Sequence, residues 1–286
     1  MASRMSARWL PWGRLAPLAA AVLGLAGLLL PTRGQADRYV GPGGEDGTNT
    51  CENAMYPCGS VAHVINVISN SSAQGDLIHL AAGTYTEPEL SFDGTYSQNL
   101  TVRGAGPGQT ILQADATPGT ASHRVLRVNT GATSTLQELT IRHGRSAAGS
   151  GDGAAGENGG GVFVNGTLYL SNVWIIANET GVGGHSATGA AGRAGDGGGL
   201  YNDGTLVMET CWVADNRTGN GGNGSLAGGR GGHGAGLCNA GGSVTILSST
   251  FSTNVAGDGG GGVPGGSGGR AGIWNSGALA VHNSTV

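Results

Sequence analysis

The chain has 286 residues and a formal net charge of −4, and all 14 of its basic residues are arginine, against 18 acidic residues. An acidic, lysine-free sequence without a basic cluster argues against a nucleic-acid-binding protein and against adhesion to anionic surfaces. Its 59 glycines also argue against a fold built from paired helices.

The first 36 residues have the pattern of a secretory signal peptide. Three arginines precede an apolar run over residues 15–30, and Gly34-Gln35-Ala36 places small residues where a signal peptidase cleaves. Pro17 interrupts this run, which is short for a bilayer span, so the pattern favours cleavage after Ala36 over retention as an anchor. Either outcome predicts a secreted or cell-surface protein, with no membrane span in the mature chain. Cleavage would leave ten arginines against 18 acidic residues, a net charge of −8.

Residues 37–124 are predicted to form an N-terminal cap and the first coils of a solenoid. Cys51 and Cys58 lie in one short loop, and a disulfide between them is the preferred interpretation. A metal site would need more ligands than this part of the sequence offers, since only His63 is near. Residues 60–69 carry apolar residues at helical spacing behind a candidate N-cap, Ser60, which predicts a short amphipathic capping helix. Strands are expected at residues 77–80, 100–102 and 111–112, with a turn over residues 103–108 between the last two.

Residues 125–286 repeat a single unit about every 37 residues. Each unit opens on a glycine-rich segment, followed by alternating apolar residues of the kind that form a strand with one buried face. A fixed period indicates one structural unit stacked on itself, and strand patterning in that unit indicates a parallel β-solenoid.

Two series of asparagines follow this period, and a third series of apolar residues accompanies them. In a parallel stack, equivalent residues lie roughly 4.8 Å apart, so one asparagine amide can donate to the next and form a ladder. We therefore predict structural ladders rather than ligands. The first series is Asn129, Asn165, Asn202, Asn239 and Asn275, the second is Asn178, Asn216 and Asn254, and the apolar series is Ile141, Ile175, Val213 and Phe251.

The repeated glycine-rich opening, with an apolar or aromatic residue shortly before asparagine, resembles the repeat of the polymorphic outer-membrane protein family. More broadly it is similar to the right-handed parallel β-helices of the pectin-lyase-like superfamily. The segments 175–178, 213–216 and 251–254 resemble the F-x-x-N element of the former, with Phe kept only at Phe251. The resemblance covers about residues 125–286. It implies an all-β, right-handed parallel β-helix in an exported protein, and it implies no particular activity, because the fold carries lyases, hydrolases, adhesins and tailspikes.

Four glycine-rich insertions leave the repeat at the same point, over roughly residues 144–160, 181–198, 219–236 and 256–272. Stacked, they would form one flank along the solenoid. Three interpretations stay open for this flank: flexible solvated loops without a partner, a binding face, or extended glycine strands packed against each other. The first is favoured over the second, because glycine offers little side-chain chemistry for specificity.

The remaining cysteines and the acidic residues point to no catalytic site. Cys211 and Cys238 lie at different phases of successive coils, so each is as readily a buried thiol in a position held by Val173 or Trp274 as half of a disulfide. Gly232-His233-Gly234 is similar to the G-H-G of polygalacturonases, but the other motifs of those enzymes are missing. We predict no catalytic residues and no cofactor; an acidic chain permits Ca²⁺ without supporting it, and the metal question stays open.

The predicted function is a secreted or cell-surface β-helix scaffold that is adhesive or binds glycans, with an extracellular polysaccharide or a cell-surface molecule as partner. The alternative is a polysaccharide lyase or glycoside hydrolase whose active site is divergent or truncated. The sequence ends partway through a coil at Val286. An uncapped parallel edge would invite edge-to-edge self-association, and a truncated reading frame is the favoured explanation.

Overall fold

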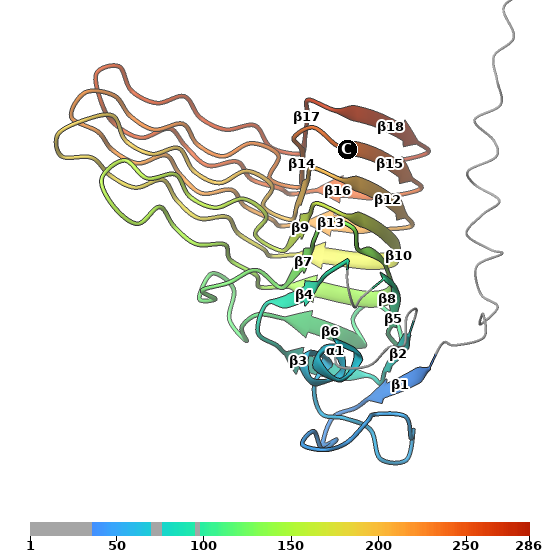
Figure 1. The fold of residues 1–286 in the computed structure, drawn as a ribbon. Coiled ribbons are helices and arrows are strands. Elements are labelled where there is room, and N and C mark those ends of the chain that lie inside the picture. The colour runs from blue at the N-terminus through green and yellow to red at the C-terminus, as the bar shows by residue number, and fades with distance from the viewer. Residues whose placement is uncertain (1–35, 70–75, 95–97) are drawn as a thin grey trace, which may run out of the picture. The chain divides into compact units, whose positions relative to one another are not determined.

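The computed structural model describes residues 36–69, 76–94 and 98–286, whose strands stack in parallel coils (Figure 1). The predicted signal peptide lies outside the described residues, apart from Ala36. All strand pairs between the described strands are parallel, as the resemblance to parallel β-helices implies. The predicted parallel β-helix is therefore confirmed.

A twelve-stranded sheet forms the larger face of the solenoid among the described residues. Its main path is β1 (Asp37–Val40), β2 (Leu77–Leu80), β5 (Gln98–Arg103), β8 (Thr133–Arg142), β10 (Thr167–Ile176), β12 (Thr205–Glu209), β15 (Ser243–Leu247) and β18 (Ala278–His282). Beside that path lie β3 (Gly83–Thr86), β6 (Thr110–Gln113), β13 (Trp212–Ala214) and β16 (Thr250–Ser252).

Among the described residues, a six-stranded sheet of very short strands forms a second face of the solenoid. In order it contains β4 (Leu90–Phe92), β7 (Leu126–Val128), β9 (Val162–Val164), β11 (Leu200–Asn202), β14 (Leu237–Asn239) and β17 (Ile273–Asn275). The two sheets enclose the apolar side chains that alternate along each strand.

The apolar series predicted from the repeat runs through this core in register. Ile141 pairs with Ile175, Ile175 with Val213, and Val213 with Phe251. All four side chains are buried. These side chains therefore stack from coil to coil inside the solenoid, which is why the pattern must recur at a fixed spacing.

The short helix α1 (Val61–Ser69) covers the first coils, as predicted. The Ser60 hydroxyl accepts a hydrogen bond from the backbone N–H of His63 at 3.2 Å, the geometry of an N-cap. The buried Glu87 carboxylate accepts the free N–H groups of Val61 and Ala62 at 2.7 and 3.2 Å. A carboxylate there also complements the positive end of the helix dipole. Among the described residues, no helix has the length and apolar character needed to cross a bilayer.

The four glycine-rich insertions extend from one side of the solenoid and lie stacked over one another (Figure 1). Each runs outward and returns, and its two arms are joined by hydrogen bonds three residues apart: Gly192 N donates to Gly184 O and Gly195 N to Gly181 O, both at 2.9 Å. Gly222 N donates to Gly192 O of the preceding coil at 3.0 Å. A repeat of three residues per turn, bonded only to neighbouring chains, is typical of polyproline II-type helices.

Glycine is required in this flank because backbone lies where a side chain would begin. A Cβ on Gly192 would overlap the carbonyl oxygen of Ala154, and a Cβ on Gly229 would overlap that of Gly192. Of the three interpretations of the insertions, packing as extended glycine strands is therefore the one observed. The favoured expectation of flexible solvated loops is wrong, because each arm satisfies its backbone groups on adjacent arms.

Candidate functional site

Six of the eight predicted asparagines form two ladders. In the first, Asn178 Nδ2 donates to Asn216 Oδ1 and Asn216 Nδ2 to Asn254 Oδ1, both at 3.0 Å. In the second, Asn202 Nδ2 donates to Asn239 Oδ1 at 2.9 Å, and Asn239 Nδ2 donates to Asn275 Oδ1 at 2.6 Å. The side chains of Asn178, Asn202, Asn216 and Asn239 are buried, and each donates its amide N–H within the chain. The Oδ1 atom of Asn202 is buried without a hydrogen-bond partner among the described residues.

The ladder prediction is wrong for Asn129 and Asn165. The residue that lies in register with Asn202 is Val164, which in turn pairs with Val128. Asn165 is therefore one residue past the ladder position and is exposed, because a slip of one residue moves a side chain to the opposite face of a strand. Asn129 donates instead to the Ser91 hydroxyl at 2.9 Å.

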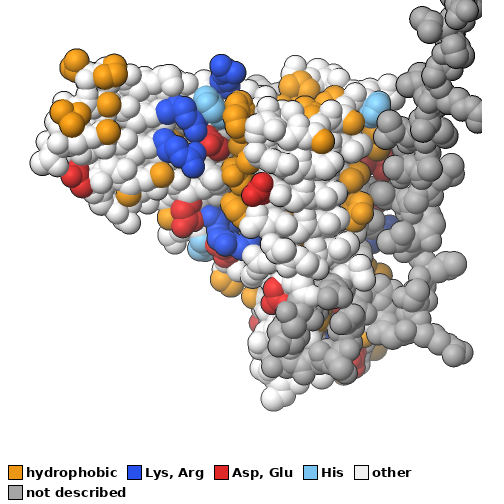
Figure 2. All heavy atoms as spheres, turned by 45° about the horizontal axis from the view of Figure 1, so that its top comes forward, with side chains coloured by type: hydrophobic (Ala, Val, Ile, Leu, Met, Phe, Trp, Pro, Cys, Tyr) orange, Lys and Arg blue, Asp and Glu red, His pale blue; other side chains and the backbone are white. Residues whose placement is uncertain are grey.

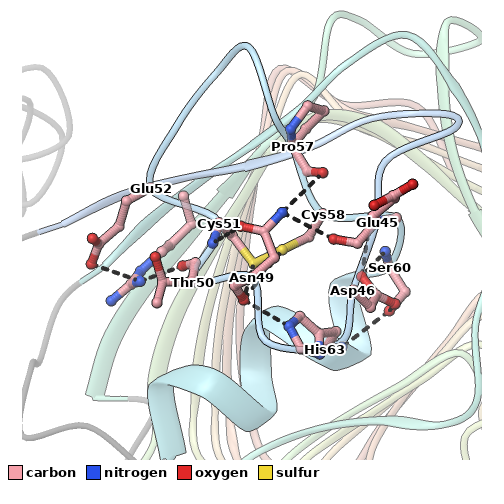
Figure 3. Close-up of a disulfide and its surroundings, with 12 residues drawn as sticks. Glu45, Asp46, Asn49, Thr50, Cys51, Glu52, Pro57, Cys58, Ser60 and His63 are labelled. Carbon is pink, nitrogen blue, oxygen red and sulfur yellow. Dashed lines mark hydrogen bonds and ion pairs between the residues drawn. A yellow bond between two sulfur atoms is a disulfide. The ribbon is translucent and has the colours of Figure 1, made fainter.

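The Cys51–Cys58 disulfide is present, with Cα atoms 5.2 Å apart (Figure 3). His63 lies close to both sulfur atoms, and its Nε2 is 2.9 Å from the carbonyl oxygen of Asn49. The donor set Cys-Cys-His would suit a soft divalent cation only as thiolates, and here both sulfurs are bonded to each other. Within the described ranges, no other group of three or more Cys, His, Asp or Glu side chains comes together closely enough to hold a metal ion.

Cys211 and Cys238 are free thiols, both buried. Cys238 pairs in register with Trp274, and Cys211 directly precedes β13, so it occupies the position of Val173. The interpretation as buried thiols is confirmed. Burial raises the pKa of Cys211 to about 12 and also raises that of Cys238, so neither thiol is a ready nucleophile.

The outer face of the six-stranded sheet carries one column of side chains, the middle residue of each strand. The first and third residues of a three-residue strand point to the opposite face, toward the core. We call this set the outer column: Ser91, Arg127, Phe163, Tyr201, Cys238 and Trp274.

Aromatic and guanidinium groups of the outer column stack on one another along the solenoid. The rings of Phe163 and Tyr201 are 5.1 Å apart and nearly parallel, at 10°. The guanidinium groups of Arg127 and Arg124 lie 5.3 and 5.4 Å from the Phe163 ring centroid. These are cation–π distances, so the column is held together by direct contact between coils.

Arg124 links the outer column to two carboxylates. Its side chain is 3% exposed and donates to Glu89 at 3.1 Å and to Glu157 at 2.6 Å. Arg127 donates to the same Glu89 oxygen at 2.9 Å. A buried guanidinium needs such partners, and both acids are engaged in satisfying it.

The returning arms of the flank place side chains every third residue, the period of their backbone. In successive coils these are Ala190, Arg193 and Asp196; Ala227, Arg230 and His233; and Pro264, Ser267 and Arg270. We call this stacked set of side chains the wall. Its base meets the outer column, since the ring of His233 stacks on that of Trp274, with centroids 5.6 Å apart and planes at 20°. Figure 2 shows arginine side chains gathered at the base of the flank, beside a row of hydrophobic side chains. We call the junction of wall and outer column the corner.

Asp196 is the centre of the hydrogen-bond network in the corner. Its carboxylate accepts from Arg193 at 2.8 Å, from both terminal nitrogens of Arg230 at 3.0–3.1 Å, and from the backbone N–H of His233 at 2.7 Å. Its side chain is 10% exposed, whereas that of Arg193 is 46% exposed. The carboxylate is thus used to fix the wall, and the arginines retain an open side.

His233 is a neutral, partly covered base in the corner. Burial lowers its pKa, and the positive charge of Arg230 lowers it further. Its Nδ1 is buried and lacks a hydrogen-bond partner among the described residues. Beside it, burial raises the pKa of Tyr201, so this phenol stays protonated and can donate a hydrogen bond.

The carboxylates of the corner are engaged in holding arginine side chains. Hydrolysis of a glycosidic bond needs two carboxyl groups that face a common substrate. Glu89, Glu157 and Asp196 each accept from arginine, which leaves none of the three free for that task. The groups of the corner that remain partly exposed to solvent are aromatic rings, the hydroxyl of Tyr201 and guanidinium groups.

The arginine cluster of the corner was not found in the sequence analysis. Arg193, Arg230 and Arg270 are separated by about one repeat each, so no local window of sequence contains more than one of them. Dividing the insertions into G-G-x triplets would have revealed this cluster. Arg230 and His233 are then the third residues of successive triplets, which lie on one face of the arm.

No protein-family model matches the chain, and no curated protein matches it. Among solved structures, a pectin methylesterase from carrot is 13% identical with a TM-score of 0.42, over 78% of this chain and 65% of that enzyme. Pectin methylesterase PemA from Erwinia chrysanthemi is 15% identical with a TM-score of 0.41, over 77% of this chain and 80% of its own. YbhC from Escherichia coli is 12% identical with a TM-score of 0.44, over 98% and 75%. The chain thus spans just under two thirds of the carrot enzyme, and identities this low concern the fold and no site.

Proposed function

We propose that this protein is an exported, non-catalytic β-helix scaffold that binds an extracellular polysaccharide along the corner. The observation that carries the proposal is the outer column, in which half-buried arginine or aromatic side chains occupy four of the six strands: Arg127, Phe163, Tyr201 and Trp274. The buried Cys238 separates Tyr201 from Trp274. A polymer lying parallel to the solenoid axis would meet such side chains on three successive coils, from Arg127 to Tyr201, and again at Trp274. Aromatic side chains with a polar tip are suited to ligands that are apolar in part and hydroxylated in part.

The flank contributes rigidity to this site. Its arms are bonded to each other and to adjacent coils, so the wall that carries Arg193 and Arg230 is held in place before any ligand arrives. Preorganisation lowers the entropy cost of binding. The predicted signal peptide ending at Ala36 and the resemblance of the repeats to polymorphic outer-membrane proteins support a role outside the cell.

The test is a binding screen of the purified protein against neutral and acidic polysaccharides, with and without Ca²⁺, that also records release of reducing or unsaturated ends. We expect binding without products, and a loss of about tenfold in affinity for the double variant R193Q/R270Q, the effect of removing charged hydrogen bonds. Arg103→Gln is the matched control, because Arg103 lies on the twelve-stranded sheet, away from the corner.

Equal loss in the control and the corner variants would refute the corner as the binding site. Release of products would instead favour the hydrolase or lyase alternative.

A further inference from the structure

The loop that carries the Cys51–Cys58 disulfide brings four possible metal donors together (Figure 3). The two Sγ atoms and a ring nitrogen of His63 all lie within 4.8 Å of one another. The carbonyl oxygen of Asn49 lies among them, 3.7 and 3.8 Å from the two sulfur atoms and 2.9 Å from Nε2 of His63. The sequence analysis found too few ligands here, because the fourth donor is a backbone oxygen.

The four donors are held in place by bonds other than the disulfide. The Cys51 carbonyl accepts from the N–H of Tyr39 at 2.7 Å, and the Cys58 N–H donates to the Tyr39 carbonyl at 2.9 Å, so both cysteines are fixed to β1. Asn49 accepts from the Cys51 N–H through Oδ1 at 2.9 Å and donates through Nδ2 to two carbonyls of the loop at 2.9 and 3.0 Å. Reduction of the disulfide would therefore leave two thiols side by side on a backbone that is still ordered.

The charges around these donors favour a cation. Residues 41–59 contain three acids and no lysine or arginine. Arg38, which donates to the loop backbone, is paired at 2.9–3.0 Å with one of those acids and with the buried Asp76. Glu87 adds a further carboxylate at the start of α1. Two thiolates added to this set would be repelled by the acids, so their ionised form needs a bound cation.

We propose that this loop binds one Zn²⁺ ion when its disulfide is reduced, through the sulfurs of Cys51 and Cys58 and the imidazole of His63. Two cysteines and one histidine with a fourth position for oxygen form a donor set that suits Zn²⁺. The Asn49 carbonyl is placed to fill the fourth position. The Cα atoms of the cysteines are 5.2 Å apart, and rotation about the Cα–Cβ bonds can separate the sulfurs around one ion.

The reduction and the metal binding are balanced as two steps. A dithiol reductant supplies two electrons and two protons to the disulfide and is itself oxidised to a disulfide. Zn²⁺ then displaces the two thiol protons to solvent. Either a disulfide or a metal ion can thus close the loop. This site belongs to the N-terminal cap and does not depend on the polysaccharide corner.

The test compares the reduced protein with the oxidised protein. The purified chain is reduced with a dithiol, freed of it without oxygen, and titrated first with Co²⁺ and then with Zn²⁺. We expect one Co²⁺ per chain, with the thiolate-to-metal charge-transfer band and the visible bands of tetrahedral coordination, displaced by Zn²⁺ with a dissociation constant of about 1 μM or below. The oxidised protein is the matched control and should show no such bands, because Cys211 and Cys238 are thiols in both forms.

A variant and a chemical measurement locate the site. His63→Gln should weaken Zn²⁺ binding about 100-fold, whereas His282→Gln, which changes an exposed imidazole on β18, should leave it unchanged. Zn²⁺ should also protect Cys51 and Cys58 of the reduced chain from iodoacetamide, followed by mass spectrometry.

Three results would each overturn the proposal: no Co²⁺ bands in the reduced chain, equal binding by the oxidised chain, or equal effects of the two histidine variants. Hydrogen exchange in β10 should be the same in both redox states. Loss of its protection on reduction would count against the proposal as well, since the donors would then not stay assembled.

Discussion

The coils and the flank of this protein are made from the same repeat but are held together by different forces. The coils bury columns of Leu, Ile and Val side chains, most of them less than 2% exposed. The flank has almost no apolar side chains to bury, and its arms are joined by backbone hydrogen bonds at three-residue intervals. Side-chain packing in the coils and backbone hydrogen bonding in the flank thus follow the same sequence period, because each needs a partner in the next coil.

The difference shows what each region can tolerate. A coil accepts a change of apolar side chain at some cost in packing, since its neighbours can partly relax. The flank accepts no side chain at positions such as Gly192, because the obstacle there is backbone. Conversely, the flank is free to vary every third residue, and that is where the arginines of the corner lie.

The largest expected effect comes from the coils. Leu170 is 1% exposed and lies between Leu136 and Met208 of the adjacent strands. Leu170→Ala should lower the free energy of unfolding by about 3 kcal/mol, from lost burial and the cavity that remains. Urea unfolding measures it. The outward Thr135 is the control, and Thr135→Ala should change stability by less than about 0.5 kcal/mol. Equal effects of the two would mean that the core does not carry stability.

A smaller and more local effect is expected in the flank. Gly229→Ala places a methyl group on the Gly192 carbonyl and should make local opening of the flank easier by about 2 kcal/mol, the usual cost of overpacking. Hydrogen exchange should accelerate at flank amides such as Gly222 and Gly260 and stay unchanged in β10.

The control for this variant is Gly268→Ala, because the nearest atom to a Cβ there is 3.9 Å away. It should leave exchange in the flank as it is in the natural sequence. If both alanines accelerate exchange equally, loss of glycine itself and not the close approach of backbone is responsible.

The fold of the coils could be predicted from the sequence, because a repeat with period-2 patterning leaves few alternatives. The register of the apolar residues 141, 175, 213 and 251 could be predicted by counting residues along the repeat. The same counting gave the wrong ladder position at Asn165. The interval between asparagines does not show where an extra residue enters a turn. Gly166 and Gly204 are equivalent, and alignment on them places Val164 opposite Asn202.

The flank and the corner could not be predicted in this way. Glycine-rich sequence is compatible with disorder and with close packing alike, and the choice depends on hydrogen bonds to neighbouring arms. The corner depends on residues about 37 positions apart that become neighbours only once the coils are stacked, as Asp196 and His233 show.

The smallest expected effect is a pH dependence that distinguishes the two regions. Burial lowers the pKa of His143, at the edge of β8, and of His233, at the base of the flank. As pH falls below the ordinary value of 6.5, the unfolded chain takes up protons before the folded one does. Stability is therefore complete above pH 6.5 and is lost as pH falls toward the lowered values of the folded state.

Each histidine should control the pH dependence of its own region. His143→Asn should flatten the pH dependence of global unfolding, followed by urea denaturation between pH 7 and pH 5. His233→Asn should flatten that of flank opening, followed by hydrogen exchange at Gly229 and Gly232 over the same range. If either variant flattened both curves, the coils and the flank would open as one unit, and the separation between side-chain packing and backbone bonding would not extend to their dynamics.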